Sequence, residues 1–221
     1  TDPLSTEATG VGISLAVAGV RANFQVARKD EFGNAQESSG DIISMQLIGP
    51  ADIEVERGSD NQQSSVMLAH YTVTIAGIYT IAGQINGDEI LGSPFQLLAI
   101  PGAIAAYQCS ASGRGVEKNT EVDSTVGFRI QARDAFANQI TKGEDNVVAS
   151  VFEYIGDLAN PIVLQVESEF VDNMDGTYDG RYLVTKSGNF RVYILVDGNH
   201  ILSSPFSITF HPGPASADTT T

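Results

Sequence analysis

The sequence predicts an all-β protein made of two tandem β-sandwich domains. Three observations lead to this prediction. Short runs rich in Val, Ile, Phe, Tyr and Thr alternate apolar and polar residues, proline and glycine interrupt the chain at short intervals, and one series of motifs occurs twice. No stretch shows a sustained helical period, and strands of this length and spacing are typical of sandwiches.

The alternation is clear in two segments. Residues 22–28 place Phe24 and Val26 between polar neighbours, and residues 127–133 follow the same pattern. Because successive side chains of a strand point to opposite faces of its sheet, each segment buries one face and exposes the other.

The two halves of the chain repeat each other. Phe32 and Phe136 occupy equivalent places in matching segments, at an offset of 104 residues, whereas Ser93 and Ser204 begin matching Ser-Pro-Phe motifs at an offset of 111. The second copy therefore carries seven extra residues between these blocks. We expect them around residues 154–161 and at the turn near Asp172, because loops absorb changes in length.

The domain boundary falls at a proline and a glycine. Pro101 lacks a backbone donor and Gly102 frees the backbone dihedrals, so a strand ends there. Each copy then has about the 100 residues of one β-sandwich. We predict one domain at 1–101 and another at 102–213, and the repeated Pro-Gly at 212–213 makes 214–221 the start of a following repeat or a tail.

The charge and hydropathy exclude several functions. The net charge is −15, from 27 acidic and 12 basic residues. Such a surface repels phosphate groups, so we expect neither nucleic acid nor anionic lipid as a partner. No apolar run is long enough to cross a bilayer, so we expect no membrane insertion in this segment.

No pattern of residues predicts an enzyme, a metal site or a cofactor. The three histidines are isolated, and no nucleophile motif or phosphate-binding glycine loop is present. The single cysteine, Cys109, forms no internal disulfide and has no neighbouring cation to make it reactive. This lone thiol, together with the absence of an N-glycosylation acceptor, favours the cytoplasm.

One acidic segment superficially resembles a calcium loop. It contains Asp172, Asn173, Asp175 and Asp179, but the order of ligands in an EF-hand is not met. We interpret the segment as a hairpin turn, because Asp175-Gly176 is a turn signal ahead of alternating residues.

The motifs in their order resemble tandem filamin (actin-binding-protein-280) repeats. The first copy lacks the Asp-Gly-Thr-Tyr element, and the second lacks a clear Gly-Pro. The resemblance implies two immunoglobulin-like β-sandwich domains. It rests on Gly19–Asn34, Asp41–Met45, Gly49-Pro50, Gly77–Tyr79, Ile90–Phe95 and Pro101-Gly102 in the first copy, and on Phe128–Asn138, Asp172–Tyr178, Tyr182, Gly188–Val192, Ser204–Phe206 and Pro212-Gly213 in the second.

The resemblance also implies where partners bind. Partner peptides would add as a strand beside the third strand, in the groove that faces the fourth. The alternative is that these strands are only scaffold. The candidate groove residues are Ile42, Ser44, Gln46, Ile48, Ile53 and Val55 in the first copy, and Val148, Ser150, Phe152, Tyr154, Val163 and Gln165 in the second.

The resulting expectation is a non-enzymatic structural segment of a longer protein. It would act as a rod or spacer in the cytoplasm or cytoskeleton, beside neighbouring repeats, with actin attachment left to a separate domain. It would bind extended peptides, such as the tails of cytoskeletal or membrane proteins. The alternatives are an ectodomain of a gamete-type adhesion protein on the extracellular face of the plasma membrane, and a flagellar structural protein in a cilium.

Overall fold

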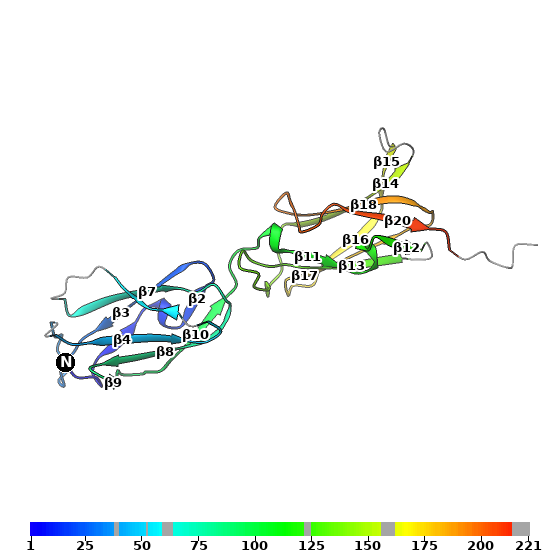
Figure 1. Cartoon of the computed structure of the whole chain (residues 1–221). Coiled ribbons are helices and arrows are strands. Elements are labelled where there is room, and N and C mark those ends of the chain that lie inside the picture. The colour runs from blue at the N-terminus through cyan, green and yellow to red at the C-terminus, as the bar shows by residue number, and fades with distance from the viewer. Residues whose placement is uncertain (38–39, 52, 59–63, 122–124, 156–161, 214–221) are drawn as a thin grey trace, which may run out of the picture. The chain divides into compact units, whose positions relative to one another are not determined.

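The chain folds into two all-β units (Figure 1), and the computed structural model describes residues 1–37, 40–51, 53–58, 64–121, 125–155 and 162–213. The units comprise Thr1–Gly102 and Ala103–Thr221. Residues 214–221, which the sequence assigns to a following repeat or a tail, lie outside the described residues. In each unit, two sheets pack face to face around a core.

The first unit pairs a smaller sheet, in the order β1-β3-β7-β6, with a larger sheet, in the order β2-β10-β8-β4-β5, and β9 pairs with β8. Strands β2 and β10 run parallel, and β4 runs antiparallel to both β8 and β5. The elements are β1 (Glu7–Thr9), η1 (Val11–Ile13), β2 (Leu15–Val17), β3 (Arg21–Ala27), β4 (Ile43–Ile48), β5 (Ile53–Glu54), β6 (Glu56–Arg57), β7 (Val66–Thr72), β8 (Gly77–Ile85), β9 (Asp88–Glu89) and β10 (Phe95–Ile100).

The second unit has the same arrangement. Its smaller sheet has the order β11-β13-β17-β16, and its larger sheet has the order β12-β20-β18-β14-β15, with β19 paired to β18. The elements are η2 (Ala106–Gln108), β11 (Ser110–Ser112), η3 (Arg114–Val116), β12 (Asn119–Glu121), β13 (Thr125–Gln131), β14 (Val147–Ile155), β15 (Ile162–Val166), β16 (Ser168–Asp172), β17 (Thr177–Leu183), β18 (Gly188–Val196), β19 (Asn199–His200) and β20 (Phe206–His211).

The predicted alternation is confirmed by the burial of the two segments. Phe24 and Val26 of β3 are buried and Gln25 between them is exposed, and β13 buries Phe128 and Ile130 about the exposed Arg129. Arg28, at the end of the first segment, is buried rather than exposed. The buried apolar side chains form a separate cluster in each unit. Each unit therefore carries its own hydrophobic core.

A buried tyrosine joins each unit's smaller sheet to the 3-10 turn that follows the sheet's edge strand β1 or β11. The Tyr71 hydroxyl of β7 donates a hydrogen bond to the Gly12 carbonyl, and the Tyr182 hydroxyl of β17 donates to the Gly115 carbonyl at 2.8 Å. Burial raises the pKa of Tyr71 to about 12, so its hydroxyl remains a proton donor at neutral pH. The bond fixes the 3-10 turn η1 or η3 over the edge of the core.

The repeated Asp-x-Phe-x-Asn motif forms a turn after β3 in the first unit and after β13 in the second. Asp30 Oδ1 accepts the backbone N–H groups of Phe32 and Asn34, at 2.9 and 2.8 Å. Asp134 accepts those of Phe136 and Asn138 in the same way. Such side-chain bonds to the following backbone hold the turn, and they explain why aspartate recurs at this place in both copies.

The strand that the sequence predicts as the third is β4 in the first unit and β14 in the second. The extra residues of the second copy lengthen β14 into a hairpin with β15. Strand β14 continues to Ile155, and β15 pairs back along Val151–Ile155. Residues 156–161, where we expected part of the extra length, lie between the two strands and outside the described residues. Figure 1 shows this β14–β15 hairpin extending from the second unit.

The expectation of extra length at the Asp172 turn is wrong. Glu169 lies opposite Arg181 in the second unit, as Glu56 lies opposite His70 in the first. Strand β16 is therefore offset from β6 by 113 residues. The strands β7 and β17 keep an offset of 111. The β16–β17 turn is therefore two residues shorter than its counterpart, because the hairpin takes all of the insertion.

Gly180 of β17 is expected to be intolerant of a side chain. A Cβ atom there would lie 2.1 Å from Phe128 Cζ. We expect Gly180→Val to lower the free energy of unfolding of the second unit by about 1–3 kcal/mol, because overpacking displaces rings and backbone. Urea unfolding followed by circular dichroism measures this change. The control is Gly127→Ala, whose Cβ would meet the Gly180 carbonyl at 3.5 Å; equal losses in both variants would contradict the prediction.

Candidate functional site

The open edge of the first unit's larger sheet is set by the backbone of Gly83. Its N–H donates to Ser93 Oγ at 3.0 Å, and its carbonyl accepts the Ile90 N–H at 3.1 Å, so both groups turn away from β4. Met45 lies opposite Gly83. Opposed residues in an antiparallel ladder alternate between exchanging hydrogen bonds and facing outward. The backbone N–H and carbonyl of Met45 therefore face away from β8, toward the side of β4 on which β5 lies.

The second unit places the equivalent residue in the same way. The Ile194 N–H donates to Ser204 Oγ at 2.9 Å, and the Ile194 carbonyl accepts the Ile201 N–H at 3.1 Å. Ala149 of β14 lies opposite Ile194, so its backbone groups face outward as those of Met45 do.

Short pairing with the chain's own next strand covers part of each edge. Strand β5 pairs with Gln46 and Leu47, and the same register places Val55 opposite Met45, so only Ile43 and Ser44 have no described segment beside them. In the second unit, β15 pairs with Val151–Ile155 and leaves Val147–Ser150. The edge expected along the whole third strand is thus shorter in both units, because the chain supplies its own neighbouring strand.

An apolar surface lies beside the open part of β4. Ile43 and Met45 of β4, together with Ile53 and Val55, are half-buried and pack against the core. Of the six residues predicted for this groove, Ile53 and Val55 belong to this inner surface. Ile42, Ser44, Gln46 and Ile48 are more exposed and lie outside it.

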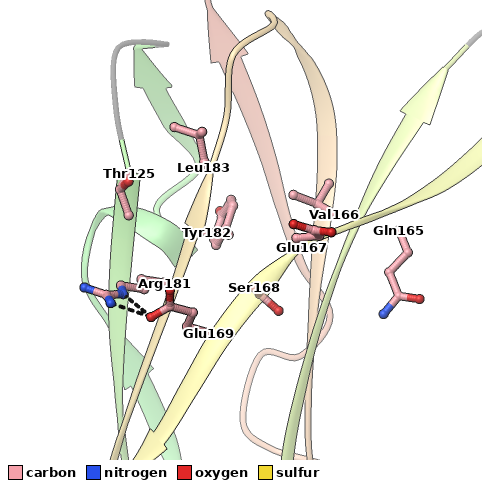
Figure 2. A pocket seen from close by; sticks show the side chains of 9 residues that line it. All are labelled: Thr125, Gln165, Val166, Glu167, Ser168, Glu169, Arg181, Tyr182 and Leu183. Atoms are coloured by element: carbon pink, nitrogen blue, oxygen red, sulfur yellow. Dashed lines mark hydrogen bonds and ion pairs between the residues drawn. The ribbon is translucent and has the colours of Figure 1, made fainter.

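The second unit has a groove of about 950 Å³ where the chain crosses from β15 to β16. The Arg181 guanidinium pairs with Glu169 across its wall, with Nε 2.7 Å from Oε2. Figure 2 shows the side chains of Val166 and Tyr182 turned toward the space between the strands. The lining residues are Thr125, Gln165, Val166, Glu167, Ser168, Glu169, Arg181, Tyr182 and Leu183.

Only one of the six residues predicted for the second unit's groove lines it, namely Gln165. Val148, Ser150, Phe152 and Tyr154 belong to the outward-facing set of β14, and Val163 pairs with Tyr154 in the same set. The lining residues Val166 and Tyr182 were not predicted. The period-two pattern separates the two faces of a strand, but it does not say which face turns toward a groove.

The acidic segment forms the β16–β17 turn, as its interpretation as a hairpin turn requires. Asp175 Oδ1 accepts the N–H and the hydroxyl of Thr177, which lowers the pKa of Asp175 below its usual value. Asp179 forms two 2.7 Å hydrogen bonds with Arg129. Within the described ranges, no group of histidine, cysteine or acidic residues is arranged to hold a metal ion.

Comparison with known proteins assigns the family. A family model described as the Filamin/ABP280 repeat matches residues 1–96 and 103–207. The chain belongs to the filamin repeat family. Both units are accordingly immunoglobulin-like β-sandwiches of the filamin type, as the resemblance implied.

The relatives are much longer than this chain. Filamin-C of Rattus norvegicus is 25% identical over 214 residues, which cover 94% of this chain and 7% of Filamin-C. Protein GAMETE EXPRESSED 2 of Arabidopsis thaliana is 25% identical over 235 residues, which cover 91% of this chain and 25% of that protein. The two filamin repeats thus span a small part of either relative.

The fold is also similar to that of a bacterial adhesin. The structure of FdeC from Escherichia coli matches with a TM-score of 0.64 and 17% identity, covering 98% of this chain and 66% of that one. At this identity the likeness concerns the fold alone. Among the described residues, no helix is long and apolar enough to cross a membrane.

Cys109 of the second filamin repeat is expected to react slowly with thiol reagents. It is fully buried, and its Sγ accepts the Arg133 N–H at 3.4 Å. Burial raises the pKa of the Cys109 thiol, which lowers its thiolate fraction. We expect Ellman's reagent at pH 8 to modify the native chain at least about tenfold more slowly than the urea-unfolded chain. Equal rates would show that the thiol is accessible.

Proposed function

We propose that this chain is a non-enzymatic structural and protein-binding segment of a longer filamin-like protein. Its two repeats act as a spacer, and each offers the open edge of its third strand to an extended partner peptide. The observation that supports strand addition most directly is the direction of two backbones: Met45 faces away from β8 with only Val55 opposite it, and Ala149 faces away from β18 with no described strand beside it.

The first repeat offers an apolar surface beside the site of an added strand. Its open edge lies beside the half-buried side chains of Ile43 and Met45. A peptide strand paired with β4 would gain backbone hydrogen bonds from the edge, and its inward side chains would cover this apolar surface. The partner is therefore an extended peptide with apolar residues at alternate positions, such as a segment of a cytoskeletal or membrane-protein tail.

A spacer role is supported by the separate cores of the two repeats. Each repeat buries its own apolar cluster, so it does not depend on its neighbour for a core. The family match extends over both repeats, and Filamin-C aligns along 94% of the chain. In this proposal the protein works in the cytoskeleton.

A segment of a cell-surface adhesion protein is the second candidate. GAMETE EXPRESSED 2 aligns along 91% of the chain at the same identity as Filamin-C. Placing an epitope tag in the full-length protein distinguishes the two. Labelling of the tag by antibody on intact cells supports the adhesion protein, and labelling only after permeabilisation supports the cytoskeletal one.

Met45→Pro is expected to abolish peptide binding at the first repeat. Proline removes the outward N–H at this position while the hydrogen bonds between β4 and β8, made by its neighbours, remain. Peptides are first selected against the whole chain from a random phage-displayed library, and their Kd values are then measured by fluorescence anisotropy. We expect Met45→Pro to weaken binding by at least about tenfold, the value of one or two lost hydrogen bonds.

The matched control is Met45→Ala. It loses the same side-chain contacts but keeps the backbone donor, so it should retain more affinity than the proline variant. Ala149→Pro makes the equivalent change in the second repeat. If binding survives both proline substitutions in folded protein, strand addition at these edges is wrong.

A further inference from the structure

The outer face of the second repeat's larger sheet carries an aromatic cluster. The Phe152 and Tyr193 rings pack edge to face with centroids 5.6 Å apart, and the Tyr154 and Tyr193 hydroxyl oxygens are 2.9 Å apart. The Arg191 guanidinium carbon lies 4.8 Å from the centroid of the Tyr154 ring. Phe152, Tyr154, Arg191 and Tyr193, which we call the aromatic platform, thus form one connected surface across β14 and β18.

The described outward positions of β14, β15, β18 and β20 carry no carboxylate, although the chain is strongly acidic. The chain has 27 acidic residues and a net charge of −15. Arg191 is exposed, and within the described part of the chain no carboxylate pairs with it. The outward positions of β14, β15, β18 and β20, which include no Asp or Glu, are Val148, Ser150, Phe152, Tyr154, Val163, Gln165, Asn189, Arg191, Tyr193, Leu195, Ser207, Thr209 and His211.

The first repeat has no such platform. The pairing of β4 with β8 places Ile48 opposite Thr80, where β14 and β18 place Phe152 opposite Arg191. Ala82 occupies the place of Tyr193. The aromatic rings and the cation are therefore not needed to build a filamin repeat of this chain, and they distinguish the second repeat from the first.

The aromatic platform suits a ligand that has an anionic group, for Arg191, next to an apolar group, for Phe152. The Arg191 guanidinium interacts with the Tyr193 and Tyr154 hydroxyls. Because a guanidinium has five N–H donors, it keeps others for a carboxylate. The ring of Phe152 and the half-exposed Val148 and Val163 flank it with apolar surface. An open sheet face of this kind suits a macromolecular partner better than a small molecule, which binds in concave pockets.

We propose that the aromatic platform binds an acidic peptide segment in which Asp or Glu stands beside a bulky apolar residue. The carboxylate pairs with Arg191, and the apolar side chain covers Phe152. An acidic polysaccharide is disfavoured, because sugars stack on open aromatic faces and Arg191 already covers Tyr154. This site shares Phe152 and Tyr154 with the predicted groove, but it is a sheet face and needs no strand addition.

The test uses the whole chain and a short fluorescein-labelled peptide that alternates Glu with Leu and Phe. Its Lys-for-Glu counterpart and polygalacturonate are the comparison ligands. We expect the acidic peptide to bind and to shift the backbone amide signals of β14 and β18 in NMR spectra of the ¹⁵N-labelled chain. We expect Arg191→Gln to weaken its binding about 10- to 100-fold, the range for a hydrogen bond to a charged group.

The matched control is Arg129→Gln, which removes one exposed cation from the opposite sheet of the same repeat. It should leave the affinity unchanged, as should Met45→Pro, which tests the separate proposal of strand addition. The inference is overturned if the acidic peptide fails to bind, if Arg191→Gln binds it normally, or if its Lys counterpart binds equally well. Binding of polygalacturonate in place of the peptide, with the same dependence on Arg191, would also overturn it.

Discussion

The hydrogen bond of one buried tyrosine hydroxyl holds each repeat in its shape. Tyr71 and Tyr182 stand at the same place in the two cores, against Phe24 and Phe128, and each donates to the carbonyl of a glycine in a 3-10 turn, η1 or η3. A buried hydroxyl without a partner would cost about 1–3 kcal/mol. The turn η1 or η3 must therefore stay over the core, within hydrogen-bonding distance of the tyrosine hydroxyl.

Within this common frame, the two repeats treat the edge of the third strand differently. The first repeat covers Gln46 and Leu47 with the two-residue strand β5. The second covers Val151–Ile155 with β15 and extends both strands into a hairpin. An edge that is already paired offers fewer backbone groups to a partner. Both repeats therefore keep only the first residues of this strand for a partner, and the second repeat also presents a broad sheet face bearing the aromatic platform.

The two sheets of the second repeat differ in the charge of their outward faces, and the hairpin enlarges one of these faces. The hairpin widens the outer face with Val163 and Gln165, and the outward positions there carry Arg191 and no acid. The acidic side chains of the smaller sheet are instead paired, Asp179 with Arg129 and Glu169 with Arg181. One repeat thus has two chemically different faces, which a net charge of −15 for the whole chain does not reveal.

The sequence by itself determined the fold class, the duplication and the buried faces, because period-two alternation and turn residues such as Asp30 and Asp134 act through local backbone geometry. It also located the insertion near Tyr154. Tertiary structure alone decided that β15 pairs with β14, that the backbone of Met45 faces away from β8, and that Phe152, Arg191 and Tyr193 meet on one face. These features depend on the register between strands far apart in the chain, which local alternation leaves undetermined.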